Sequence, residues 1–268
     1  AWVFLGGIVL NTAQDDLNAG EYVIPQHASM HEVMNILVEG KAILHQVTIP
    51  EGYTSEQIVA KLREHPILVG EITEVPAEGT LLPETYSFDR GATRSQVIDR
   101  MRRAQERVLE EIWGRRNDDL PVTTPQELVV LASIVEKETG KADERPRVAG
   151  VFINRLKKGM RLQSDPTILY GLYGGEAWDQ PRTIYRSDMQ RPNAYNTYQI
   201  EGLPPGPIAN PGRASIEAVT NPSRTDDLFF VADGSGGHAF SETLAEHNRS
   251  VEKWRSVEAN RSSGGSGN

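Results

Sequence analysis

The chain contains no cysteine, which excludes disulfide bonds, thiolate metal sites and a cysteine nucleophile. Histidine is also scarce, with six in 268 residues. The stretch "HEVMN" at His31 lacks the second histidine of a zinc-binding helix motif. We therefore expect neither a metal ion nor another cofactor.

Basic residues are outnumbered, with 28 Lys and Arg against 37 Asp and Glu and a net charge of −9. Nucleic-acid-binding proteins usually carry an excess of positive charge, so we expect no nucleic-acid partner. The 38% of hydrophobic residues is enough for a real core, and the length allows two domains or one large one.

Long apolar runs are missing as well. The N-terminal "AWVFLGGIVL" has ten residues, whereas a membrane-spanning helix needs about 20. It also lacks the basic flank and cleavage site of a signal peptide. We expect a strand and turn here, in a chain that has lost upstream sequence. The C-terminal "SSGGSGN" has the composition of a flexible linker, and we expect disorder over residues 259–268.

A short internal repeat is present near the N-terminus. Residues 23–37, "VIPQHASMHEVMNIL", align with residues 48–62, "TIPEGYTSEQIVAKL". In each copy an extended apolar-Pro segment precedes a capping box, Ser29-x-x-Glu32 and then Thr54-x-x-Gln57. Two β-turn-α units are predicted, of a size that suits a binding or spacer module. Convergence of two good helix starts remains the alternative.

Periodicity and capping signals outline the rest of the chain. Residues 192–211 are rich in Pro, Gly and Asn, and a loop of this length is usually functional. Residues 228–241 are predicted to form a hairpin. The predicted helices are 93–115, 124–139 with Gly140 as the stop, 144–158 ending at Gly159, a short helix capped by Asp165-Pro166, one starting at Asn210-Pro211, and 244–254.

The stretch "LASIVEKETG", residues 131–140, ends a buried helix with two glutamates. Residues two apart on a helix differ by about 200° in direction, so Glu136 and Glu138 cannot share a face. Glu138 has Lys141 three residues on, which predicts an ordinary surface pair. Glu136 lies on the face of core residues such as Ala132 and has no cation at helical spacing.

Partial desolvation of Glu136 would disfavour its anion, which is the property a general acid needs. A buried structural glutamate, or a helix end that frays into water, remains the alternative. Serine and phosphate chemistry do not fit. Ser133 and Lys137 are four residues apart rather than three, and "GSGGH" at 234–238 precedes a strand rather than a helix.

Several longer motifs carry a family resemblance, which covers roughly residues 20–255. The segments 131–172, 195–212 and 229–248, with "EGTLLPETYSF" at 78–88 ahead of them, resemble the YceG-like endolytic murein transglycosylases. The resemblance implies an α+β fold with a small LysM-like N-terminal module and a helix-centred YceG-like catalytic domain with a β-hairpin. The expected boundaries are 1–80 for the module, 81–258 for the catalytic domain and 259–268 for the tail.

The implied activity is that of a lyase that cuts the β-1,4 bond between N-acetylmuramic acid and N-acetylglucosamine in nascent glycan strands. The product would end in 1,6-anhydro-muramic acid, and strand elongation would stop. The implied partners are peptidoglycan strands and the cell-wall synthesis machinery. The implied location is the bacterial inner membrane, through an N-terminal anchor absent from this chain, with the catalytic domain facing the periplasm.

The first glutamate of "IVEKE", Glu136, falls on the family's catalytic glutamate. The other candidates are expected to bind substrate: Gln163, Asp165, Tyr195, Asn196, His238 and Glu84. Plainer roles stay open for four of them. Asp165 could cap a helix, Asn196 could hold its loop, His238 could simply end a strand, and Glu84 could shape a turn.

One carboxylate suffices if the muramoyl C6 hydroxyl is the nucleophile, because an internal nucleophile has a high effective concentration. Two alternatives remain. A two-carboxylate hydrolase would need Asp165 or Asp188 as the partner of Glu136. A non-catalytic peptidoglycan-binding scaffold would keep the fold without the chemistry.

Replacing Glu136 by Gln keeps the size of the side chain and removes its transferable proton. Turnover should fall by about 10²–10⁴-fold with folding unharmed, whereas the matched change Glu138→Gln should leave turnover nearly unchanged. Release of soluble fragments from peptidoglycan measures both. Equal losses in the two variants, or none in Glu136→Gln, would contradict the assignment.

Overall fold

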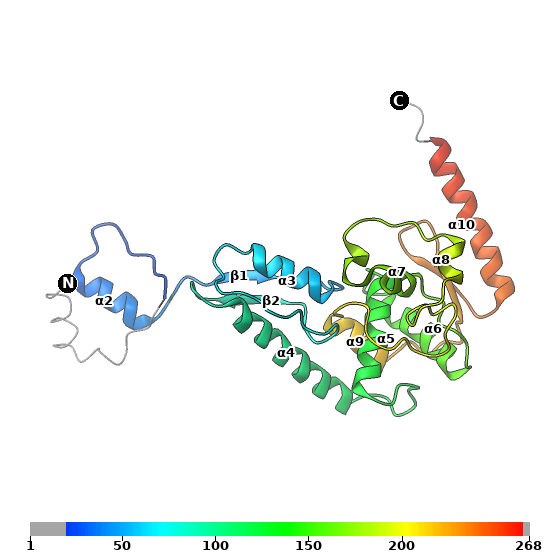
Figure 1. Ribbon diagram of the computed structural model, residues 1–268, viewed down its shortest axis with the longest axis horizontal. Coiled ribbons are helices and arrows are strands. Elements are labelled where there is room, and N and C mark those ends of the chain that lie inside the picture. The colour runs from blue at the N-terminus through cyan, green and yellow to red at the C-terminus, as the bar shows by residue number, and fades with distance from the viewer. Residues whose placement is uncertain (1–19, 265–268) are drawn as a thin grey trace.

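Three parts follow one another along the long axis of the chain (Figure 1). The computed structural model describes residues 20–264, with side chains described to residue 258. Helix α2, Met30–Glu39, lies at one end and is joined to the rest by an extended segment. The strand predicted in the first ten residues lies outside the described part of the chain.

The central unit combines a two-stranded sheet with two helices. Strand β1 pairs antiparallel with β2, and His45 faces Phe88 in the register. Its core contains Val47, Ile58 and Met101, all buried. The elements are β1 (His45–Thr48), α3 (Ser55–Glu64), β2 (Thr85–Phe88) and α4 (Arg94–Gly114).

Both predicted capping boxes are confirmed. Ser29 accepts from the Glu32 N–H at the start of α2, and Thr54 accepts from the Gln57 N–H at the start of α3. Only the second copy has a strand, since residues 20–29 contain none. The repeat therefore continues through the turn and the helix but does not give two complete β-turn-α units.

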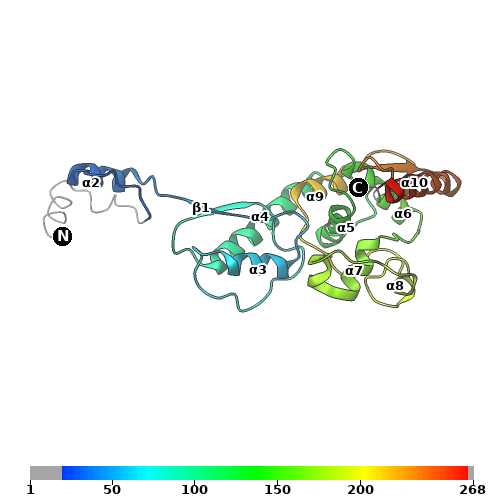
Figure 2. The same cartoon turned by 90° about the horizontal axis from the view of Figure 1, so that it is seen from above.

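The third part is built around α5, which is buried on every side from Leu128 to Val135. Helix α5 packs against α6, α7 and α9, and Figure 2 shows it among them. Thr124 caps α5 and Pro125 opens it, as predicted. The helices are α5 (Pro125–Glu138), α6 (Arg145–Lys157), α7 (Asp165–Tyr173), η1 (Gly174–Trp178), α8 (Arg186–Gln190) and α9 (Arg213–Thr220).

Three predicted helix ends differ from the structure. Helix α5 ends at Glu138 with Thr139 extended, and Gly140 is not in the left-handed region. The N-cap of α7 is Ser164, so Asp165 is its first residue rather than its cap. Helix α9 begins after Gly212 and not at Asn210. The signals placed these three ends up to three residues away, but they did not predict η1 or α8, and the last helix runs to Gly264 rather than ending at 254.

The chain closes with a hairpin and a long helix. Strands β3 (Phe229–Ala232) and β4 (His238–Ser241) pair antiparallel, which confirms the hairpin. Helix α10, Leu244–Gly264, projects away from the third part (Figure 1). It continues through residues 259–264, so the disorder predicted there is wrong. No helix within residues 20–264 has the length and apolar character needed to cross a bilayer.

Helix α4 contributes to both hydrophobic cores. Its N-terminal half places Val97 and Met101 in the core of the central unit, and its C-terminal half places Ala104, Val108 and Ile112 in the core around α5. These five residues are the ones that the helical period places on one face. One continuous helix therefore spans the two cores.

Asn210 joins the central unit to the loop before α9. Its side chain is fully buried. The amide oxygen accepts from the Leu81 N–H at 3.0 Å, and the amide nitrogen donates to Tyr53 O at 3.2 Å and Ser55 Oγ at 3.1 Å. The Asn210 side chain thus forms hydrogen bonds with buried polar groups from two segments of the central unit.

Replacing Asn210 by Ala should lower the free energy of unfolding by about 2–3 kcal/mol, because the buried Leu81 N–H and its neighbours lose their partner. Urea denaturation measures the change. Asn248→Ala, at an exposed position of α10, is the control and should stay within about 0.5 kcal/mol of the parent protein. Equal stability of the two variants would contradict this role for Asn210.

Candidate active site

The carboxylate of Glu136 lies against the N-terminus of α9. Its Oε2 accepts from the Gly212 N–H at 2.9 Å and from Ser215 Oγ at 2.7 Å. Gly212 is the N-cap of α9, where backbone N–H groups lack partners in their own helix and the helix dipole favours negative charge. The Glu136 side chain is only 6% exposed. The last turn of α5 therefore places a charge that water barely reaches where α9 can bind it.

Arg145 provides a cation next to this carboxylate. Its Nη2 lies 3.7 Å from Glu136 Oε1 and 3.7 Å from Glu51 Oε2, and its side chain is 9% exposed. The expectation that Glu136 has no nearby cation is wrong. Arg145 is the first residue of α6 and reaches Glu136 because the chain folds back between α5 and α6. Spacing along a single helix could not reveal it.

Glu51 is a second carboxylate at this site, and it comes from the central unit. It follows β1, and its side chain is 44% exposed. Burial, and then the charge of Glu136, raise the pKa of Glu51, while Arg145 opposes the shift. A Cβ at Gly212 would collide with the Glu51 carboxylate, so any other residue there would displace the Glu51 side chain from its present position. Glu51 and Glu136 share one arginine.

Sequence reasoning missed Glu51, although the internal repeat contains a signal. The dipeptide Glu51-Gly52 occupies the place of Gln26-His27 in the first copy. Gly52 and His27 both have a positive φ, 75° and 66°, so the two turns share their backbone shape. Only the second copy combines a carboxylate with a glycine that lets the loop lie against Glu136 and Lys137.

Two hollows lie on either side of the Glu51–Arg145 pair. The first, about 490 Å³, has Glu51, Tyr53, Lys137 and Trp178 in its lining. The second, about 810 Å³, has Arg145 in its lining. Glu51 and Arg145 are ion-paired, so each hollow has one member of the pair in its lining. Glu136 lines neither hollow and is connected to both through Arg145 and Glu51.

Lys137 connects the first hollow to helix α5. Its Nζ lies 4.1 Å from the centre of the Trp178 ring and donates to Gly52 O at 3.2 Å. Burial lowers the pKa of Lys137 to about 8, although the charge of Glu136 opposes the shift. The lysine thereby fixes the loop after β1 against the end of α5.

Glu138 points to the opposite side of α5, and its predicted surface pair with Lys141 is wrong. Ser164 Oγ donates to Glu138 Oε1 at 2.5 Å, whereas Lys141 pairs with Glu144. Burial raises the pKa of Glu138 to about 7. Glu136 and Glu138 are only two residues apart in sequence, but their side chains contact different partners on opposite sides of α5.

Two predicted substrate-binding residues lie beside Glu138 and not beside Glu136. Gln163 and Asp165 line a hollow of about 170 Å³ that also contains Glu138 and Tyr198. The Tyr198 hydroxyl donates to Asp165 Oδ1 at 2.7 Å. Gln163 has a φ of 52°, a left-handed conformation that its loop imposes.

The remaining predicted residues are dispersed. Tyr195 packs edge-on against Tyr170 at 4.9 Å between ring centres. Asn196 is fully buried and donates to three carbonyls at the C-terminal end of α8. His238 Nδ1 lies 2.7 Å from Glu144 Oε2, and Glu84 is exposed at the start of β2. Within residues 20–258, none of the six predicted side chains is hydrogen-bonded or ion-paired to Glu136.

A buried glutamate that accepts from a helix N-terminus beside a second carboxylate and an arginine is an arrangement that acid–base enzymes use. The model of the YceG-like family matches residues 1–253. The chain therefore belongs to the YceG-like family, on an α+β fold of helices and two small sheets.

Two curated relatives are each named endolytic murein transglycosylase. The one from Bacillus subtilis (strain 168) is 33% identical over 267 residues, which cover 88% of this chain and 72% of the relative. The one from Streptococcus pneumoniae serotype 2 (strain D39 / NCTC 7466) is 30% identical over 282 residues, covering 88% of this chain. The chain spans half the length of this second relative.

A solved structure is similar over most of its length. The crystal structure of a YceG-like protein from Listeria monocytogenes has a TM-score of 0.60 to this chain and 30% sequence identity. The match covers 92% of this chain and 88% of the other. The fold described above is therefore shared within the family.

The raised pKa of Glu138 makes stability depend on pH. The proton is bound more tightly in the folded protein, so this contribution to stability is complete below the ordinary value of 4.5 and is lost as pH rises through about 7. Between these limits the parent protein should lose about 2–3 kcal/mol of unfolding free energy relative to Glu138→Gln. The pKa of Glu78 is also raised to about 7. Because Glu78 is present in both proteins, its contribution cancels in the difference between their unfolding free energies. Parallel curves of urea-derived stability against pH would contradict this expectation.

Proposed function

We propose that the chain is an endolytic peptidoglycan lytic transglycosylase, a lyase with Glu136 as its catalytic residue. The substrate is the glycan strand of murein, cut at the β-1,4 bond between N-acetylmuramic acid and N-acetylglucosamine. The new end is 1,6-anhydro-muramic acid, and elongation of the cut strand stops. The names of the two relatives support this activity. The observation that carries it is the buried Glu136 carboxylate, bound by Gly212 and Ser215 and flanked by Arg145.

The reaction needs one proton carrier and no water. Protonated Glu136 donates to the glycosidic oxygen, and the bond from this oxygen to C1 of the muramoyl sugar breaks. The C6 hydroxyl oxygen of the same sugar then bonds to C1, and its proton returns to Glu136. Gly212 and Ser215 fix the direction of the carboxyl group before and after the transfer. Glu51 is placed to stabilise the positive charge that develops at C1.

A strand-like substrate fits the two hollows better than a small one. An endolytic enzyme must accept sugars on both sides of the bond that it cuts. The hollow of about 490 Å³ offers Trp178 and Tyr53, and the hollow of about 810 Å³ continues beyond Arg145. Sugars on the two sides of the bond would then occupy different hollows.

The central unit is proposed to hold the glycan strand as a LysM-like module. It supplies Glu51 and Tyr53 to the site and is joined to the third part through Asn210. The protein itself is proposed to act at the outer face of the bacterial inner membrane, facing the periplasm, beside the cell-wall synthesis machinery. Gln163, Asp165 and Tyr195 are proposed to act on the α7 side of α5, where the small hollow beside Glu138 lies.

A hydrolase is the second candidate, and Glu51 favours it. Glu51 and Glu136 lie around one arginine, and a hydrolase needs two carboxylates at the bond. In that enzyme Glu51 would activate water instead of stabilising charge at C1. Asp165 and Asp188, the partners considered from the sequence, have other contacts: Asp165 accepts from Tyr198, and Asp188 from the Tyr185 N–H.

Cleavage of murein in ¹⁸O-labelled water separates these functions. The lyase should release fragments that end in 1,6-anhydro-muramic acid and carry no label, since the C6 hydroxyl is the nucleophile. Mass spectrometry of the released fragments measures both features. Label at C1 would show that water attacked and would establish the hydrolase. No release by the parent protein, with Glu136→Gln as the inactive control, would leave only a binding scaffold.

A further inference from the structure

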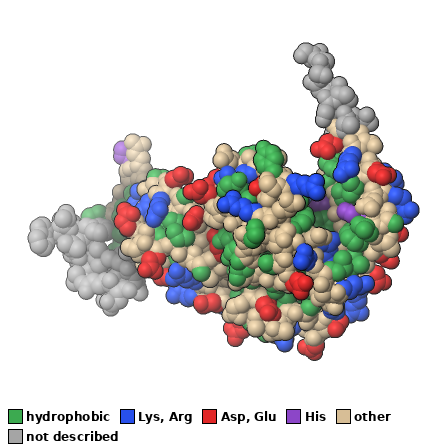
Figure 3. Space-filling model, turned by 45° about the vertical axis from the view of Figure 1, so that its right-hand side comes forward, with side chains coloured by type: hydrophobic (Ala, Val, Ile, Leu, Met, Phe, Trp, Pro, Cys, Tyr) green, Lys and Arg blue, Asp and Glu red, His purple; other side chains and the backbone are tan. Residues whose placement is uncertain are grey.

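The larger hollow differs in charge from the rest of the chain. Its lining contains four arginines and one glutamate, and so a net charge of +3, whereas the whole chain carries −9. Figure 3 shows acidic and basic side chains interspersed over one face of the molecule. An excess of arginine within one concave site is therefore a local feature. The charged residues are Arg115, Arg116, Arg145, Arg224 and Glu217.

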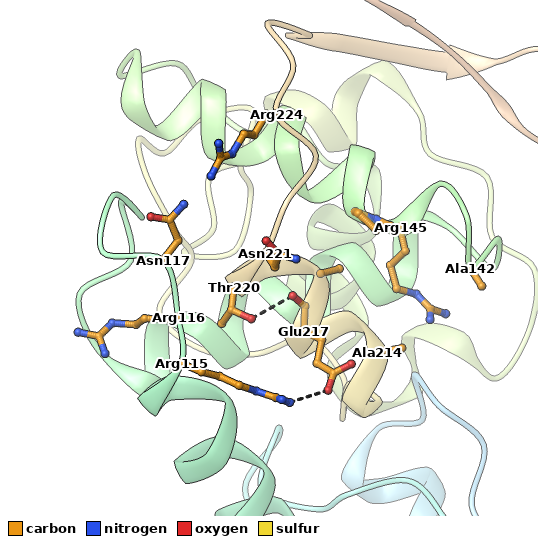
Figure 4. A pocket seen from close by; sticks show the side chains of 12 residues that line it. Arg115, Arg116, Asn117, Ala142, Arg145, Ala214, Glu217, Thr220, Asn221 and Arg224 are labelled. Atoms are coloured by element: carbon orange, nitrogen blue, oxygen red, sulfur yellow. Dashed lines mark hydrogen bonds and ion pairs between the residues drawn. The ribbon is translucent and has the colours of Figure 1, made fainter.

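One of these arginines already has acidic partners. Arg115 Nη2 lies 3.0 Å from Glu217 Oε1 and 3.1 Å from Glu111 Oε1, and Glu217 also binds Arg213. Figure 4 shows Arg115 directed towards Glu217. The only acidic residue in the lining is thus occupied by Arg115 and Arg213, and Arg145 is paired with Glu51 and Glu136 outside the lining.

Arg116 and Arg224 have no acidic partner among residues 20–258. Arg116 stacks on Trp113 at 4.0 Å, which holds its guanidinium in place without neutralising it. Arg224 is exposed, and Figure 4 shows its guanidinium on the side of the Asn117 amide, with Asn221 near. Arg116 Nη1 donates to Trp113 O at 2.9 Å, and the guanidinium and amide groups of this end of the hollow are all potential hydrogen-bond donors.

Arg145 forms the opposite end of the same hollow (Figure 4). Its Nε is buried and has no hydrogen-bond partner among the described residues. Its Nη2 contacts Glu51 and Glu136 only at 3.7 Å, which is longer than a charge-assisted hydrogen bond. The hollow therefore has at one end an arginine that is ion-paired with Glu51 and Glu136, and at the other Arg116 and Arg224, which have no acidic partner among residues 20–258.

We propose that this hollow binds an anionic oxygen group carried by the murein strand, next to the sugar that is cut. The proposal rests on the function proposed above. Guanidinium groups bind carboxylates and phosphates through paired N–H donors, and a murein strand offers both. Each muramoyl sugar can carry a peptide with free carboxylates on its lactyl group, and a strand still attached to its lipid carrier has a pyrophosphate at one end.

If the hollow binds this anion, cleavage depends on the peptide or pyrophosphate of the strand as well as on its sugars. A muramoyl residue with its peptide would be placed with the lactyl side towards Arg116 and Arg224, and its C1 towards Glu136. Bare sugars would be placed by the first hollow alone. The arginines act on binding and not on the proton transfers, so their loss should raise KM and leave kcat nearly unchanged.

The test uses Arg224→Ala and the double variant Arg116→Ala/Arg224→Ala. The double lysine variant keeps the charge, and Arg103→Ala, an exposed arginine of α4 outside the hollow, is the matched control. The substrates are peptide-bearing strands, strands stripped of peptides by an amidase, and stripped strands that retain the lipid pyrophosphate. Thermal melting checks that each variant is folded.

For peptide-bearing strands, KM should rise about five- to tenfold in the double variant, less in Arg224→Ala, and little in the lysine and Arg103→Ala variants. For stripped strands without pyrophosphate, all proteins should behave alike. A rise confined to pyrophosphate-bearing strands would identify phosphate, and not the peptide carboxylate, as the bound anion. Unchanged KM on all three substrates would overturn the proposal.

Binding provides a readout that does not depend on catalysis. Titration calorimetry of the three strand types into Glu136→Gln, with and without the two arginine changes, should show the same pattern of weakened affinity. It should also show a smaller salt dependence in the arginine variants. If the parent protein cleaves no strand, the proposed function fails on its own, and these titrations still decide whether the hollow binds the anion.

Discussion

The hydrogen bonds from the start of α9 to the Glu136 carboxylate are the constraint on which the site depends. Helix α5 is buried along its length, so a charge at its end receives little hydration and must be matched by protein groups. Gly212 and Ser215 supply the donors, and Arg145 supplies the opposite charge. The loop carrying Glu51 packs against this end of α5 through Gly52, and the Glu51 carboxylate occupies the space that a side chain at Gly212 would take.

This arrangement also explains why two carboxylates can coexist near each other. Glu51 is more exposed than Glu136 and carries the raised pKa, whereas Glu136 receives the donors of α9. One arginine between them reduces their repulsion without neutralising both. The two carboxylates therefore lie in different surroundings, Glu136 buried against the start of α9 and Glu51 half-exposed beside it.

Local signals allowed much of the fold to be predicted. The helical period placed five residues of α4 in the cores, and the two capping boxes start α2 and α3 as expected. The period also separated Glu136 from Glu138. The partners of these glutamates could not be predicted, since Arg145, Glu51 and Ser215 approach through tertiary folding. For the same reason Glu138 was taken for a surface residue, although Ser164 reaches it from the start of α7.

The course of α4 through both cores has a consequence for cooperativity. A helix whose two halves are buried in different cores cannot unravel in one core without removing packing from the other. The central unit and the helices around α5 should therefore melt as one unit, and a cut at residues 80–81 would separate β1 and α3 from the Met101 and Tyr86 side chains that complete their core. The same rigid helix keeps the loop of Glu51 at a constant distance from α5. Glu51 and Glu136 thus belong to parts of the chain that one helix holds together while the protein remains folded.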